Sequence, residues 1–242
     1  MPAGEVGTVS TAWAVFSVVG GTLIGSAIST AVAFYIQKKN LSAAKAQRDN
    51  DRFENRKAQC YSLLFKMIRI HSTIAVLEKA VANSLANAET VGLQGTLWQR
   101  ITPSGNMPPR VKFTSEEMAL LLSLDFNLFN DIGPYDDIHN SLLDIFELYG
   151  AKRHALTERF GAKMTAAVGS IGLSQADKDW LAPRSFELES VAQVIVDRTT
   201  HDSSESKGLL ERLHALFVKE FKIKPRLVSL PLVGQIGSNP RP

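Results

Sequence analysis

Hydrophobic residues are distributed in two different ways along the chain. Residues 12–36 form an almost unbroken run of apolar and small side chains, and no charged residue occurs between Val6 and Gln37. Inside a bilayer, a helix satisfies every backbone amide and carbonyl within its own segment. A helix over this run would be about 37 Å long, which exceeds the ~30 Å hydrocarbon layer. The run therefore predicts a transmembrane helix over 12–36, with Trp13 and Tyr35 near the two interfaces.

A cleaved signal peptide is the alternative for this run, because Ala31-Val32-Ala33 has the small-x-small form of a cleavage site. The segment before the run has no Lys or Arg and contains Glu5. The run is also longer than a signal-peptide core and continues directly into a polar helical sequence. These three features favour an uncleaved anchor.

Further along, apolar residues recur with helical spacing. Residues 41–85 contain neither Gly nor Pro, and their apolar positions are spaced by three, four or seven residues. This pattern predicts a long helix with one buried face, preceded by a solvated stalk over 37–52. The apolar positions are Phe53, Cys60, Leu64, Met67, Ile70 or His71, Ile74, Leu77, Val81 and Leu85.

A long loop and two helices follow. Residues 92–113 contain several Gly and Pro and little periodicity, which predicts a long connection. Thr114 and Glu117 form a capping box at the start of a helix that should end near Gly133. Pro134 suits the first turn of the next helix, whose apolar stripe consists of Ile138, Leu142, Ile145, Tyr149, Leu156, Phe160 and Met164.

The C-terminal part is also predicted to be helical. Ser174 is expected to cap a short helix that Pro183 stops, and Ser203 or Ser204 is expected to cap a last helix bearing Leu210, Leu213, Phe217 and Phe221. Residues 186–196 fit a strand at their start and a helix later, and their helical neighbours favour a helix.

No run alternates long enough to build a sheet, so we expect an all-α fold. It would consist of one N-terminal transmembrane helix followed by a cytoplasmic helical bundle over 53–222, with a flexible tail over 223–242.

Charge sets the expected orientation of the anchor. No Lys or Arg precedes the run, whereas residues 38–57 carry seven against three acids. Basic residues beside a span resist translocation, so we expect the tail over 1–11 outside and the C-terminal side in the cytoplasm, at an inner membrane. Whether these residues also hold anionic lipid headgroups is left open. The juxtamembrane basic residues are Lys38, Lys39, Lys45, Arg48, Arg52, Arg56 and Lys57.

Small residues recur at every fourth position of the predicted span. Such a stripe lets two helix backbones approach closely, which favours self-association, most simply a homodimer. The alternative is that Gly, Ala and Ser are common in membrane spans in any case. The residues of this stripe are Ser17, Gly21, Gly25, Ser29 and Ala33.

Acidic residues are concentrated in the middle of the chain, although the whole chain of 242 residues has a net charge of +3. No Lys or Arg occurs between Lys112 and Lys152. This region predicts either the solvated face of two helices or a surface for a basic partner, for which the chain's own stalk is one candidate. Its acids are Glu116, Glu117, Asp125, Asp131, Asp136, Asp137, Asp144 and Glu147.

The residues that carry chemistry are scattered. The lone Cys60 lies on an apolar stripe, which favours a core position, and no intramolecular disulfide can form. Asp125 begins a segment that resembles a calcium loop only at its start. His201-Asp202-Ser203 contains the residue types of a catalytic triad, but they are adjacent in sequence, and a helix cap explains them better. We therefore expect no catalytic, metal or cofactor site. The five histidines are His71, His139, His154, His201 and His214.

These features predict a single-pass membrane protein that acts as an interaction, scaffold or sensor module. Its partners would be the membrane, a second copy and an unknown protein. Nucleic acid is not expected, because the basic residues are mostly juxtamembrane. One alternative is a self-associating effector that perturbs the bilayer. Another is an enzyme whose site includes Asp136, Asp137 and His139.

Overall fold

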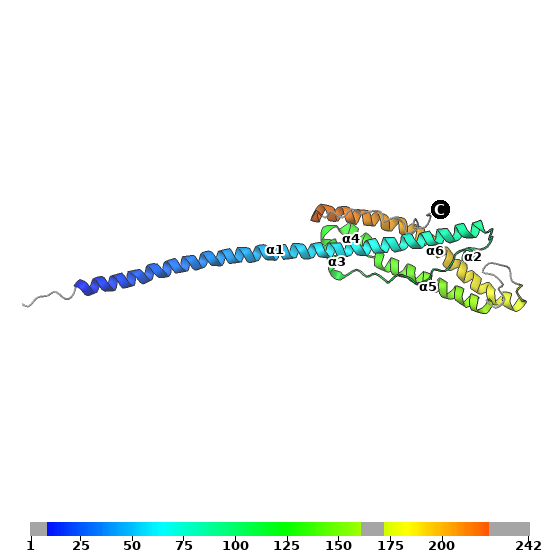
Figure 1. Cartoon of the computed structure of the whole chain (residues 1–242), viewed down its shortest axis with the longest axis horizontal. Coiled ribbons are helices and arrows are strands. Elements are labelled where there is room, and N and C mark those ends of the chain that lie inside the picture. Colours follow the sequence, from blue (N-terminus) through cyan, green and yellow to red (C-terminus); the bar gives the residue numbers. More distant parts are fainter. Residues whose placement is uncertain (1–8, 161–171, 223–242) are drawn as a thin grey trace, which may run out of the picture. The chain divides into compact units, whose positions relative to one another are not determined.

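Helices are the only regular elements in the part of the chain that the structure describes. The computed structural model describes the backbone of residues 9–160 and 172–222, and the side chains of residues 32–160 and 172–222. No strand occurs in these ranges, so the predicted all-α fold is confirmed. The helices are α1 (Val9–Thr90), α2 (Leu97–Arg100), α3 (Ser115–Leu124), α4 (Phe126–Ile132), α5 (Tyr135–Phe160) and α6 (Gln175–Phe221) (Figure 1).

The chain divides into two compact units, Met1–Arg56 and Lys57–Pro242. In the first unit the described residues form the N-terminal part of α1. From residue 32 to residue 56 every side chain is exposed, including those of the predicted stalk. The exposed fractions of Phe34 and Tyr35 are 67% and 70%.

A helix near the N-terminus is long and apolar enough to cross a membrane, by length and composition. Within residues 32–90 of this helix, 39% of the most apolar stretch is buried inside the structure. The first buried side chain of the described helix is Cys60, so this stretch includes core residues of the second unit. The uncharged run of the sequence lies earlier, between Val6 and Gln37.

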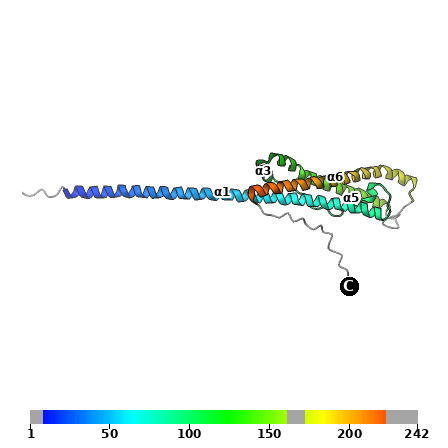
Figure 2. The ribbon, with the colours of Figure 1, turned by 90° about the horizontal axis from the view of Figure 1, so that it is seen from above.

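The second unit is a helical bundle. Its part of α1 lies alongside α6, and α5 pairs with α6 (Figures 1 and 2). The short α4 contacts α6, whereas α3 packs against α4. The core joins Leu63 and Ile74 of α1 with Phe146 of α5 and Ile195 and Phe217 of α6, all of which are buried.

The apolar stripe of α1 is buried from Cys60 to Val81, as its spacing predicts. At the ambiguous position Ile70 is buried and His71 is only half-buried, whereas Phe53 is exposed. The helix continues to Thr90 and ends at Gly92, whose φ of 68° is the left-handed conformation that glycine adopts at low cost. The amide of Leu93 bonds to the carbonyl of Ala88, as in a Schellman motif.

The predicted single helix over 114–133 is wrong, because two helices occupy this range. Thr114 accepts a bond from the Glu117 amide and caps α3 as predicted. Asp125 then adopts an extended backbone, and its carboxylate accepts a bond from the Leu128 amide at 2.9 Å. An aspartate gains more as a helix cap than in a helix interior, so it ends α3 and begins α4.

The two predicted C-terminal helices are one. Ser174 caps α6 as predicted, but the helix continues through Pro183, and Ser203 lies buried in its interior. The helical prediction for 186–196 is confirmed. A proline within a helix costs about 3 kcal/mol. Tertiary contacts offset this cost, because Trp180 packs edge-on against Phe160 before the proline and Leu188 is buried after it.

Polar side chains, one buried and one half-buried, hold the long connection against α5 and α6. The Tyr149 hydroxyl lies 2.8 Å from the carbonyl oxygens of Trp98 and Ile101. The Glu189 carboxylate accepts bonds from the amides of Leu97 and Trp98. The predicted loop over 92–113 therefore contains the short helix α2 and is fixed to the bundle by specific side chains.

Candidate functional site

The predicted acidic surface contains two buried members. Glu117 is 2% exposed and accepts bonds from Lys66 at 2.7 Å, Ser62 at 2.5 Å and the Thr114 amide. Burial tends to raise the pKa of Glu117, but these bonds outweigh it and lower the pKa below its ordinary value. Asp136 is also buried and accepts a bond from the Phe113 amide at 3.0 Å. These two acids stabilise the fold.

Most of the remaining acids have partners within the chain. Asp131 pairs with Arg212 at 2.8 Å. Asp144 and Glu147 both pair with Arg110, at the end of the long connection. Asp125 caps α4, whereas Glu116 and Asp137 are exposed.

The predicted association stripe lies in α1. The side chains of Ser17, Gly21, Gly25 and Ser29 fall outside the described residues, and Ala33 is exposed. Ala33 begins a shallow apolar helix face, which continues through Ile36, Gln37, Asn40, Leu41 and Ala44.

The juxtamembrane basic residues belong to the same helix. Lys38, Lys39, Lys45, Arg48, Arg52 and Arg56 are exposed, and Lys57 is half-buried.

The residues considered for an unread enzyme site are Asp136, Asp137 and His139, and Asp136 is already bonded to the Phe113 amide. His139 is buried, and its Nδ1 lies 3.1 Å from the Asn140 side-chain oxygen, while Asp137 is exposed. Burial lowers the pKa of His139 most. The Asn140 side chain both accepts from the Val111 amide and donates to the Val111 carbonyl. This group holds the long connection in place.

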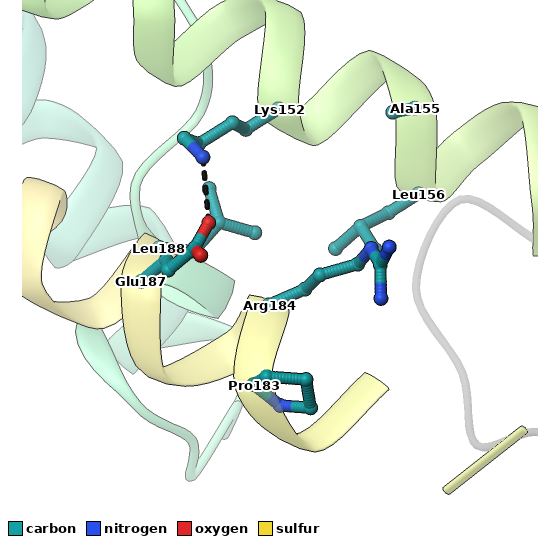
Figure 3. A pocket seen from close by; sticks show the side chains of 7 residues that line it. All are labelled: Lys152, Ala155, Leu156, Pro183, Arg184, Glu187 and Leu188. Atoms are coloured by element: carbon teal, nitrogen blue, oxygen red, sulfur yellow. Dashed lines mark hydrogen bonds and ion pairs between the residues drawn. The ribbon is translucent and has the colours of Figure 1, made fainter. Parts of the chain in front are cut away.

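A pocket of about 430 Å³ lies between α5 and α6 (Figure 3). From α5 it is lined by Lys152, Ala155 and Leu156. From α6 it is lined by Pro183, Arg184, Glu187 and Leu188. Its volume is in the range of small ligand sites.

Charged groups border this pocket. Lys152 reaches from α5 to the Glu187 carboxylate of α6 at 2.6 Å, whereas Arg184 extends toward Leu156 (Figure 3). The hydrogen bond from Lys152 lowers the pKa of Glu187, so the Glu187 carboxylate is ionised at neutral pH. The charged residues among its described walls are Lys152, Arg184 and Glu187.

Trp180 fixes the position of Arg184. The Arg184 guanidinium lies 4.0 Å from the centroid of the Trp180 ring, and its Nη1 donates to the Trp180 carbonyl at 2.9 Å. Arg159 lies over the same ring at 4.3 Å and pairs with Asp177. The Trp180 ring and the Trp180 carbonyl both hold the Arg184 guanidinium in place. The other N–H groups of the guanidinium remain available as donors.

The pocket was not predicted from the sequence. In the sequence, Lys152 and Ala155 are ordinary positions of a predicted amphipathic helix, and Pro183 is a predicted helix stop. The nearest signal is the set of basic residues in the second half of α5. The pairing of Lys152 with Glu187, 35 positions later, depends on the register of two helices.

Comparisons with known proteins assign no role to this site. No protein-family model matches the chain, and no curated protein or solved structure matches it. Among the described residues, no cluster of three metal-ligating side chains occurs.

Proposed function

We propose that this chain is a membrane-anchored adaptor, held by residues 12–36, whose helical bundle binds a protein partner at the cytoplasmic face. The observation that carries the anchor is the exposure of Val32, Phe34, Tyr35 and Ile36 at the end of the uncharged run. These neighbouring residues point to different sides of the helix and have more than half of their surface in solvent. A helix that is apolar all round is stable in lipid or in a protein core.

The bundle supports the binding part of the proposal. It carries exposed aromatic and aliphatic side chains, and its pocket between α5 and α6 has charged and apolar walls suited to binding. The exposed basic residues after the run support a cytoplasmic bundle by the positive-inside rule.

Orientation is testable by cysteine labelling, because Cys60 is the one native cysteine. It is buried, and burial raises its pKa to about 12, so its reactive thiolate is scarce at neutral pH. Two variants, Ala3→Cys and Ser42→Cys, place a thiol on either side of the proposed span. A membrane-impermeant maleimide should label Ala3→Cys in intact cells and Ser42→Cys only after permeabilisation, with the wild type as background.

The reverse labelling order would overturn the proposed orientation. Release of the wild-type protein from membranes at alkaline pH would overturn the integral anchor. The adaptor role is tested by crosslinking in native membranes: a defined second protein supports it, and products containing only this chain contradict it.

A second candidate function is a self-associating membrane effector. The exposed face that begins at Ala33 supports it, because that face extends the stripe of Ser17, Gly21, Gly25 and Ser29. Gly25→Cys should then form a disulfide-linked dimer under mild oxidation, whereas the control Leu23→Cys should not. Overexpression of an effector should also dissipate the membrane potential, which an adaptor would leave intact.

A further inference from the structure

The pocket between α5 and α6 is the end of a longer surface. On α5, residues spaced by three or four form one side: Ser141, Ile145, Leu148, Lys152 and Ala155. On α6, the matching side consists of Arg184, Glu187, Val191, Val194 and Arg198. We name these ten residues the α5–α6 seam.

Two polar bridges fix the register of the seam. At the pocket end, Lys152 pairs with Glu187. At the other end, Arg198 donates to the Ser141 hydroxyl at 2.9 Å and to the Ile138 carbonyl at 3.0 Å. Since both bridges join the same two helix faces, the residues between them also lie along one surface.

The middle of the seam is apolar and accessible. Leu148 and Val194 are 48% and 41% exposed, and Ile145 and Val191 are half-buried beside them. The polar residues of the two bridges on either side already have partners within the chain. The apolar side chains between them therefore gain from a partner that covers them.

Arg184 provides a point for charge recognition. Lys152 is neutralised by Glu187, and Arg198 pairs with Asp202 at 3.2 Å. Arg184 forms no ion pair among the described residues, while Trp180 holds it in position. A preorganised arginine loses little side-chain entropy when it binds a carboxylate.

We propose that the α5–α6 seam binds an acidic amphipathic segment of a partner protein, with a carboxylate on Arg184 and apolar side chains over Leu148 and Val194. This inference rests on the proposed adaptor function and names its docking surface. From Arg184 to Val194 the seam extends about 15 Å along α6, which suits a polypeptide better than a small molecule. Asp131 and Asp144 of this chain already pair with Arg212 and Arg110, so a second copy would have to use other acids, and the test below distinguishes that outcome.

Site-specific photocrosslinking tests the seam in the full-length chain in native membranes. The photoreactive amino acid p-benzoylphenylalanine replaces Val194 in one variant and Val218 in its matched control. Both valines lie in α6, and their exposed fractions are 41% and 38%, but Val218 lies outside the seam. We expect Val194 to give a protein adduct whose crosslinked peptide is acidic, with apolar residues three or four apart. The same adduct should be at least about tenfold weaker from Val218, because crosslinking requires contact.

A second variant tests the charge. Arg184→Glu should lower the Val194 adduct about tenfold, since it turns an attraction into a repulsion. Arg184→Lys should retain part of it, and thermal melts check that both variants remain folded.

Other outcomes separate the two proposals. Equal adducts from both positions, an adduct of this chain with itself, a lipid adduct, or no change with Arg184→Glu would each overturn the seam. A protein adduct from Val218 alone would overturn the seam and leave the adaptor function standing. Failure of the cysteine-labelling test would overturn the proposed orientation, whatever the seam binds.

Discussion

Residues 32–56 and residues 60–81 belong to the same helix, yet their side chains have different surroundings. In the first segment every side chain is exposed, whereas the second buries Cys60, Leu64, Met67 and further residues at helical spacing. The first segment begins with consecutive apolar residues from Val32 to Ile36 and continues with basic ones. The second alternates apolar and polar residues with the period of a helix packed on one side.

The comparison teaches that the period of the apolar pattern is more informative than apolar content. The most apolar stretch of the helix between residues 32 and 90 is 39% buried, so apolar content alone would select core residues there. The uncharged run before Lys38 has no such period. Its membrane assignment rests on the absence of a polar face, and that is the feature to test.

The largest expected effect comes from giving the run a polar face. The double substitution Leu23→Arg with Ile24→Arg places two charges near the middle of the proposed span. Each costs about 2.5–3.5 kcal/mol on insertion scales, so together they should largely abolish insertion. Alkaline extraction should move most of the protein to the supernatant, whereas the control Leu23→Ile with Ile24→Leu should stay in the pellet. A double arginine variant that remains in the membrane would contradict a span at this position.

The next largest effect is expected inside the bundle, at Glu117. Glu117→Ala removes the acceptor for Lys66, Ser62 and the Thr114 amide. Lys66 is partly exposed and can recover some hydration, so we expect a loss of about 2–3 kcal/mol in the free energy of unfolding. Urea unfolding measures this loss. The exposed neighbour provides the control, because Glu116→Ala should change stability by less than about 0.5 kcal/mol.

Glu117 also predicts a dependence on pH. Its pKa in the folded state is lowered from the ordinary value of 4.5, so its contribution is complete above that value. This contribution is lost as the pH falls from 4.5 through the lower folded value, because in that range the unfolded state binds a proton that the folded state does not. Glu117→Gln should remove that part of the acid destabilisation. Parallel stability curves for wild type and variant across this range would contradict the assignment.

Local signals in the sequence predicted much of the fold. The capping box of Thr114 and Glu117, the Ser174 cap and the apolar spacing of α1 depend on neighbours within a few turns, and all appear as predicted. The split at Asp125 was a local cap that the prediction missed, whereas the other error occurred where distant contacts override a local preference. Pro183 should stop a helix, but packing of Trp180 on Phe160 and burial of Leu188 carry α6 through it.

A smaller effect is expected where the long connection meets the bundle. Tyr149→Phe removes the hydroxyl that lies between the carbonyls of Trp98 and Ile101. Arg153 still donates to the Trp98 carbonyl, so the loss should be about 1–2 kcal/mol. Hydrogen exchange should rise around Trp98 and Ile101, and urea unfolding should give the free-energy change. Tyr61→Phe is the matched control, since Tyr61 is only half-buried, and unchanged exchange in Tyr149→Phe would contradict the proposed attachment.

The candidate site was harder to predict than the fold, because it depends on two helices. The acids from Glu116 to Glu147 formed a conspicuous group in the sequence, but several bind partners that are distant along the chain, such as Lys66 and Arg212. The pocket residues Lys152 and Arg184 belong to no sequence motif. They line one pocket because α5 and α6 pack against each other. Spacing within one helix cannot reveal a register between two.

The smallest expected effect separates buried from exposed charges in the bundle. Arg212 pairs with Asp131 at 2.8 Å, but their side chains are 52% and 45% exposed, whereas the Glu117 side chain is 3% exposed. Water solvates an exposed pair almost as well when the partner is removed, so Arg212→Ala should cost less than about 0.5 kcal/mol at physiological salt. Urea unfolding at low and high salt measures it, with the wild type as reference. A loss as large as that of Glu117→Ala would mean that this pair is shielded, for example by another molecule that covers α4 and α6 in solution.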